Sequence, residues 1–138
     1  MLKAKDIMTT QVITATKDTP ILEALELLAK NNITGIPVVE DEMTLVGILT
    51  EKDVLRLFYT NDDLTKETVN SFMTQPAVYF DENEALGDVC ECLMNYFLRR
   101  VPVTSNGKVV GIISRPDIIE YILQQRQINM KPADAVPE

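Results

Sequence analysis

The chain carries the same three short motifs twice, in the same order, and this internal repeat constrains its fold more than any other feature. A Met-Thr pair comes first, a Pro-Val pair follows, and a Gly-x-x-Thr/Ser-x-x-Asp motif comes last. The matched segments are 6–9 with 71–74, 36–38 with 101–103, and 47–53 with 111–117. The offset is 65 residues for the first two pairs and 64 for the third, so the copies differ by one residue in the turn before the last motif. The 138 residues therefore hold two copies of one unit of about 60 residues.

Each copy shows the same succession of extended and helical patterns. A short extended segment (12–14, then 77–80) precedes a stretch whose apolar residues recur on one face of a helix. These apolar positions are Ile21, Ala24, Leu25, Leu28 and Ala29 in the first copy, and Leu86, Val89, Cys90, Leu93, Met94 and Phe97 in the second. Two strands follow in each copy, near 36–40 and 45–49 and near 101–104 and 109–113, with hairpin turns at 41–42 and 105–108. A last helix begins at Glu51 and at Arg115, so the order β-α-β-β-α occurs twice and predicts an α+β fold.

A single copy is too small to bury much of its own surface. Two copies that each expose an apolar sheet face gain by packing sheet to sheet, and the duplication then imposes pseudo-two-fold symmetry, with clefts where the copies meet. We expect a first repeat at 1–60, a linker at 61–69, a second repeat at 70–125 and a polar C-terminal tail at 126–138.

Composition excludes several classes of protein. The net charge is −8 and the longest basic run is Arg99-Arg100, so the chain lacks the cationic surface that non-specific nucleic-acid binding requires. Histidine is absent, which removes Ser-His-Asp triads and histidine-based metal sites. Cys90 and Cys92 point to different sides of a helix, so we expect ordinary packing from them and neither a disulfide nor a metal site.

The sequence also predicts where the protein works. No apolar run is long enough to span a membrane, and the N-terminus lacks the apolar core of a secretion signal. We therefore expect a cytoplasmic protein with no membrane partner.

The Thr50-x-x-Asp53 and Ser114-x-x-Asp117 tetrapeptides allow two interpretations. Each matches a capping box that starts a helix, and Pro116 supports this interpretation because proline is tolerated in a first helical turn. Each also lies where the symmetry places a cleft between the copies. There a helix N-terminus can bind phosphate, the carboxylate can accept ribose hydroxyls, and the preceding glycine would let a ligand approach the backbone.

These duplicated motifs resemble the CBS (cystathionine-β-synthase) domain family over about residues 3–125, and the pair resembles a Bateman module. The resemblance implies the β-α-β-β-α fold and an adenine nucleotide or related adenosyl ligand in the clefts. It places ribose at the motif aspartate, phosphate at the Thr or Ser, and adenine on the first strand of the other repeat. One implied site comprises Thr50, Asp53, Ala77, Val78, Arg99 and Arg100; the other comprises Ser114, Asp117, Val12, Ile13, Ile33 and Thr34.

The two implied sites differ in charge. Arg99 and Arg100 enter the first site, and guanidinium groups suit phosphate oxygens. Thr34 and Gly35 occupy the matching positions of the second site and bring no cation. We therefore expect the Asp53 site to bind nucleotide better than the Asp117 site. Arg99 and Arg100 could instead be a solvated pair at a helix end.

The sequence thus predicts a regulatory module that senses AMP, ADP, ATP or a related adenosyl ligand and has no catalytic residue, cofactor or metal. A structural or protein-interaction domain with vestigial clefts is the alternative. Because no catalytic domain is attached, any effector must be a separate protein. Family members commonly dimerise through their helices, and the apolar residues of the last helices could supply a homodimer contact. They are Val54, Leu55, Leu57, Ile118, Ile119, Tyr121 and Ile122.

Overall fold

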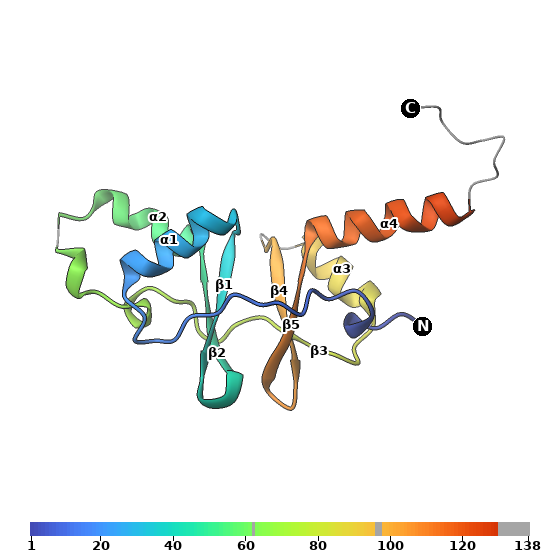
Figure 1. Cartoon of the computed structure of the whole chain (residues 1–138), viewed down its shortest axis with the longest axis horizontal. Coiled ribbons are helices and arrows are strands. Elements are labelled where there is room, and N and C mark those ends of the chain that lie inside the picture. The colour runs from blue at the N-terminus through green and yellow to red at the C-terminus, as the bar shows by residue number, and fades with distance from the viewer. Residues whose placement is uncertain (62, 96–97, 130–138) are drawn as a thin grey trace.

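The computed structural model describes residues 1–61, 63–95 and 98–129, and it confirms the α+β fold (Figure 1). Phe97, Asp62 and residues 130–138, which the sequence analysis placed in a helix, the linker and the tail, lie outside the described residues. The helices are α1 (Ile21–Asn31), α2 (Glu51–Leu55), α3 (Leu86–Asn95) and α4 (Arg115–Asn129). The strands are β1 (Gly35–Glu40), β2 (Thr44–Thr50), β3 (Phe80–Asp81), β4 (Arg100–Ser105) and β5 (Lys108–Ser114).

The expected first strands at 12–14 and 77–80 do not form as predicted, since residues 12–14 and 77–79 belong to no strand. In the second copy β3 forms two parallel pairs with β4, and in the first copy only Ala15 pairs, with Val38. A turn follows Ala15 at once, because the amide of Thr16 donates to the Thr19 hydroxyl at 2.9 Å and the Thr19 amide donates to the Thr16 carbonyl at 3.1 Å. This turn prevents the extended segment from continuing beyond Ala15.

The last helix of the second copy is longer than expected. α4 continues to Asn129, four residues beyond the predicted end of the repeat at 125. Its last turns contain Gln and Arg, which are good helix formers, and no glycine or proline occurs between Pro116 and Pro132. Within the described residues, no helix is long and apolar enough to cross a bilayer.

The hairpin turns explain the one-residue gap between the copies. The β4–β5 connection has two residues, Asn106 and Gly107, with φ of 53° and 80°. Positive φ at both positions gives the primed turn whose twist matches a hairpin, and Asn-Gly is the favoured pair for it. The β1–β2 connection, Asp41–Met43, has one residue more, with φ of 56° at Glu42 and 70° at Met43.

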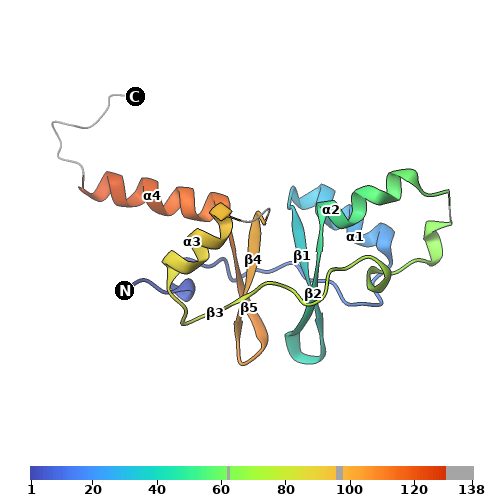
Figure 2. The ribbon, with the colours of Figure 1, turned by 180° about the vertical axis from the view of Figure 1, so that it is seen from behind.

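Each repeat has its own hydrophobic core. Figure 2 shows the helices of each repeat beside its own hairpin. In β1 the buried side chains of Ile36 and Val38 enter the first core. Pro37 and Val39 must point to the opposite face because side chains alternate along a strand. They are buried too, so both faces of the hairpin are covered, as packing of one repeat against the other requires.

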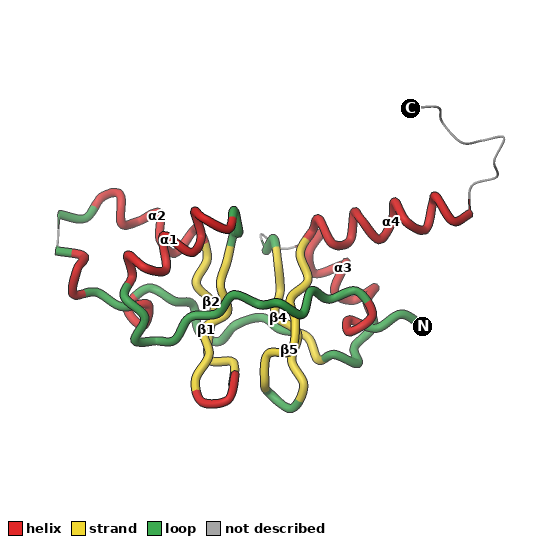
Figure 3. The backbone as a smooth tube through the Cα atoms, viewed as in Figure 1, coloured by secondary structure: helices red, strands yellow, loops and turns green. Residues whose placement is uncertain are grey.

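The segment at the start of each copy packs on the other repeat. We call residues 3–9 the first arm and residues 68–74 the second arm. The first arm pairs with the second repeat, through Lys3 with Ala85 and Thr9 with Ile112; the second arm pairs with the first repeat, through Thr68 with Pro20 and Thr74 with Ile48. Ala4 is fully buried in the second core and Val69 in the first. Figure 3 shows the N-terminal segment beside α3 before it crosses to the other repeat.

Gly47 and Gly111 make room for these arms. A Cβ on Gly47 would lie 2.8 Å from the carbonyl oxygen of Thr74, and one on Gly111 would collide with the side chain of Met8. The expectation that these glycines let a ligand approach the backbone is therefore wrong. The backbone needs them because the arm of the other copy passes directly over the strand.

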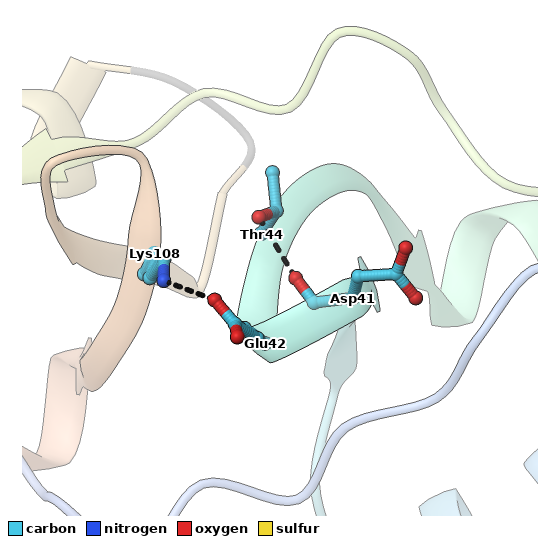
Figure 4. Close-up of polar contacts among 4 residues, drawn as sticks. All are labelled: Asp41, Glu42, Thr44 and Lys108. Atoms are coloured by element: carbon cyan, nitrogen blue, oxygen red, sulfur yellow. Dashed lines mark hydrogen bonds and ion pairs between the residues drawn. The ribbon is translucent and has the colours of Figure 1, made fainter.

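The tips of the two hairpins join the repeats into one five-stranded sheet with the order β1-β2-β5-β4-β3. Thr44 pairs with Lys108, and the Leu45 amide donates to the Gly107 carbonyl at 3.0 Å. The Lys108 ammonium also forms an ion pair with Glu42 at 2.8 Å (Figure 4). Since both side chains are well exposed, this ion pair contributes at most about 1 kcal/mol.

Candidate ligand clefts between the repeats

Two clefts lie between the repeats, and they are equivalent under the repeat offset. The first cleft has a volume of about 690 Å³ and the second of about 150 Å³. The first is lined by Thr34, Gly35, Ile48, Thr50, Glu51, Lys52, Asp53, Arg56, Thr74, Pro76, Val78, Leu98, Arg99 and Arg100. The second is lined by Thr9, Gln11, Ile13, Ile33, Gly35, Arg100, Ile112, Ser114 and Asp117. Every residue of the second list has its repeat counterpart in the first, so the duplication built the same site twice.

The capping-box interpretation of Thr50 and Asp53 holds in the structure. The Asp53 carboxylate accepts from the Thr50 amide at 2.9 Å and from the Thr50 hydroxyl at 3.0 Å, and the Asp53 amide donates to that hydroxyl at 3.3 Å. These bonds fix the start of α2 and hold the carboxylate at the wall of the first cleft. Capping and ligand binding are therefore compatible roles for the same pair.

Thr74 of the second arm adds a contact that the sequence analysis missed. Its hydroxyl donates to the other oxygen of the Asp53 carboxylate at 2.9 Å, and it lines the first cleft. The second cleft repeats the cap, with Asp117 accepting from the Ser114 amide at 2.8 Å and the Ser114 hydroxyl at 2.9 Å. Among the described residues, however, no hydrogen bond joins Thr9 to Asp117. The duplicated Met-Thr motif was the available signal, but its pairing partner depends on the crossing of the arms.

Arg100 lies between the two clefts and lines both of them. Its side chain is half-buried, and its Nε donates to the Thr34 hydroxyl at 3.1 Å. Burial lowers the pKa of the guanidinium, while the carboxylates of Asp117 and Glu51 oppose that change. Thr34 and Gly35 bring no cation to the second cleft, as expected, but Arg100 of β4 also lines that cleft, which the sequence did not indicate.

The first cleft gathers positive charge on an acidic chain. Lys52, Arg56, Arg99 and Arg100 line it together with the carboxylates of Glu51 and Asp53. Arg56 follows Asp53 by about one helical turn, which was the sequence signal for its place on the same wall. Its guanidinium also donates to the Phe72 carbonyl at 3.3 Å and lies 5.1 Å from the centroid of the Phe72 ring. No cluster of three or more Cys, Asp or Glu residues in the described part of the chain could hold a metal ion.

The structure brings together most of the residues that the resemblance implied. Thr50, Asp53, Val78, Arg99 and Arg100 line the first cleft, and Ser114, Asp117, Ile13 and Ile33 line the second. Ala77 is buried beside Val78 and is not among the lining residues, and Val12 likewise gives way to Ile13. Thr34 was expected in the second cleft but lines the first. Its hydroxyl accepts a hydrogen bond from Arg100.

The fold and its paired clefts define a tandem-repeat module with sites between the copies. The chain belongs to the CBS-domain family, because the model of the CBS domain matches residues 4–60 and again residues 69–124.

Known proteins of this family resemble the chain in sequence and in structure. Protein MJ1225 of Methanocaldococcus jannaschii is 34% identical over 118 residues, which are 86% of this chain and 42% of that protein. The structure of CBSX2 in complex with AMP superposes with a TM-score of 0.80 at 28% identity, covering 91% of this chain and 99% of that one. The CBS pair of protein MJ0100, in complex with 5′-methylthioadenosine and S-adenosyl-L-methionine, gives a TM-score of 0.77 at 31% identity, covering 91% and 98%.

Some relatives contain the pair within a longer protein. The chain spans 24% of the length of the inosine-5′-monophosphate dehydrogenase of Aquifex aeolicus, to which it is 33% identical over 120 residues.

Proposed function

We propose that this chain is a regulatory module that binds an adenine nucleotide in its first cleft. The observation that carries the proposal is the meeting of Asp53 with four cationic side chains in a cleft of about 690 Å³. This volume is within the usual range for small-molecule sites. Complexes of CBSX2 with AMP and of MJ0100 with adenosyl ligands support the ligand class.

The chemistry of the first cleft matches the parts of a nucleotide. The Asp53 carboxylate can accept hydrogen bonds from two ribose hydroxyls in place of the Thr74 hydroxyl. Arg99, Arg100 and Lys52 can bind phosphate oxygens, for which charged hydrogen bonds are strong. The apolar walls, formed by Ile48, Pro76 and Val78, suit the faces of an adenine ring.

AMP and ATP should bind at least about tenfold more tightly than S-adenosylmethionine, since one favourable charge interaction is worth about that factor. The cleft has more cationic than acidic side chains, whereas the methionyl sulfonium group of S-adenosylmethionine carries positive charge. Calorimetric titration of the nucleotide-free protein with the three ligands tests this. Preference for S-adenosylmethionine would contradict the nucleotide assignment. A folded protein that binds none of the three would favour the alternative, a structural domain with vestigial clefts.

The proposed role of the protein is regulation and not catalysis. Neither cysteine is among the described residues that line the clefts, and the chain has no histidine. Cys92 lies in the second core, where burial raises the pKa of its thiol. The nucleotide would act as a regulatory ligand by changing how the repeats contact a separate effector protein.

The proposal includes a homodimer formed by the last helices. Equivalent positions of the two copies expose apolar side chains: Leu55, Phe58 and Tyr59 after the first cleft, and Ile119, Ile122 and Leu123 on α4. Two such related stripes make a self-complementary surface for a second copy. Of the residues expected from the sequence, Val54, Leu57 and Ile118 pack on their own cores instead.

A double substitution of Phe58→Glu and Ile122→Glu should convert the dimer to a monomer, because each change buries a charge in the apolar contact. Light scattering after size exclusion measures the mass. Met94→Glu is the matched control, since Met94 is 74% exposed outside both stripes. A wild-type monomer at micromolar concentration, or a dimer that survives the double substitution, would contradict this contact.

A further inference from the structure

The two clefts share only two lining residues, Gly35 and Arg100. These residues are equivalent positions of the two copies, at the starts of β1 and β4. Only one of them carries a charge. The two clefts therefore share one charged group, the guanidinium of Arg100.

Arg100 stands between a carboxylate of each cleft. Glu51 belongs to the first cleft and Asp117 to the second, and both favour its charged form. A Cβ on Gly35 would lie 3.7 Å from the Cδ of Arg100, so the side chain passes close to the opposite repeat. Its Nε donates to Thr34, a residue of the first cleft, at 3.1 Å. The same group thus has partners on both sides.

We propose that the two clefts compete for Arg100, so that negative charge in one cleft weakens anion binding in the other. The proposal rests on the proposed function, because it concerns the nucleotide of the first cleft. An anionic ligand there draws the guanidinium toward its phosphate and away from Asp117. Coupling of this kind is reciprocal, so a group that holds Arg100 in the second cleft lowers the affinity of the first.

The competition has unequal consequences for the two clefts. The first cleft also has Lys52, Arg56 and Arg99, and it keeps positive charge when Arg100 is held elsewhere. Among the described residues that line the second cleft, Arg100 is the one cation. The second cleft therefore loses all of its positive charge when a nucleotide in the first cleft takes Arg100.

The experiment measures AMP binding to the first cleft while the second-cleft carboxylate is removed. Asp117→Asn keeps an acceptor for the Ser114 cap but releases Arg100, so the dissociation constant of AMP should fall about fivefold, the lower end of usual site-to-site couplings. In an Arg100→Gln background, the same change should alter the constant less than about twofold. Glu120→Gln is the matched control, because it removes the same charge from an exposed position of α4 outside the second cleft.

The outcomes separate this inference from the proposed function. Equal effects of Asp117→Asn and Glu120→Gln would show a general charge effect and overturn the competition. An Asp117→Asn effect that persists without Arg100 would overturn it as well. Wild-type protein that binds no AMP would instead overturn the proposed function, and the competition with it. If Arg100→Gln binds too weakly to measure, the comparison of Asp117→Asn with Glu120→Gln still decides.

Discussion

Replacing Asp53 with alanine is expected to weaken AMP binding by about two orders of magnitude, because each hydrogen bond to a charged group contributes roughly 1.5–3 kcal/mol. The carboxylate is held at the cleft wall by Thr50 and receives the Thr74 hydroxyl, which a ribose hydroxyl can replace. No other carboxylate among the described lining residues of the first cleft is fixed by a cap. Calorimetric titration of the variant with AMP gives the loss directly.

Asp117→Ala is the matched control for Asp53→Ala. Both substitutions remove one capping box and should cost a similar, small amount of stability, about 1 kcal/mol. Only Asp53→Ala should lose AMP affinity, whereas Asp117→Ala should raise it by freeing Arg100. Equal losses in the two variants, with both proteins folded by thermal unfolding, would show that the nucleotide does not distinguish the clefts.

Replacing Gly47 with alanine is expected to lower the free energy of unfolding by about 2 kcal/mol, within the range for overpacked sites. The added Cβ would lie 2.8 Å from the carbonyl oxygen of Thr74. This oxygen belongs to the backbone, so it cannot relieve the clash by a change of rotamer. The second arm would have to move off β2, where Thr74 and Ile48 exchange backbone hydrogen bonds of 2.8 and 3.0 Å. Urea unfolding measures the change.

Two other glycines serve as controls for Gly47. Gly111→Ala should cost less, because the added Cβ meets chiefly the flexible side chain of Met8. Gly87→Ala should stabilise the protein by roughly 0.5–1 kcal/mol, since Gly87 is exposed within α3 and no atom lies within 4 Å of its added Cβ. A Gly47 variant as stable as the wild type would show that the arm is not tightly held against β2.

The sequence predicted the parts of the fold that depend on local pattern. Alternation, helical periodicity and the Thr50 and Ser114 caps located the hairpin strands and the starts of the last helices, because these features are set by residues near in sequence. The offset of 65 also related Thr9 to Thr74. It did not show that each arm packs on the opposite repeat, because a duplicated motif carries no information on which copy it contacts.

The same limit explains what was missed in the site. Arg99 and Arg100 were expected at the first cleft, but the place of Arg100 in both clefts depends on how the starts of β1 and β4 meet at the pseudo-two-fold axis. Lys52 lies in α2 and Arg56 directly after it, and the sequence analysis did not consider either residue for the site. Thr34 matched a family position but turned toward Arg100.

The crossing of the arms bears on how such a chain could have arisen. A polypeptide with one copy would leave a gap in its core where Ala4 or Val69 now lies. It could fill that gap by exchanging arms with a second polypeptide. The tandem chain is then the covalent equivalent of an arm-exchanged pair, and fusion let the two halves diverge, so that Gly35 and Arg100 could come to differ where a symmetric ancestor had one residue twice.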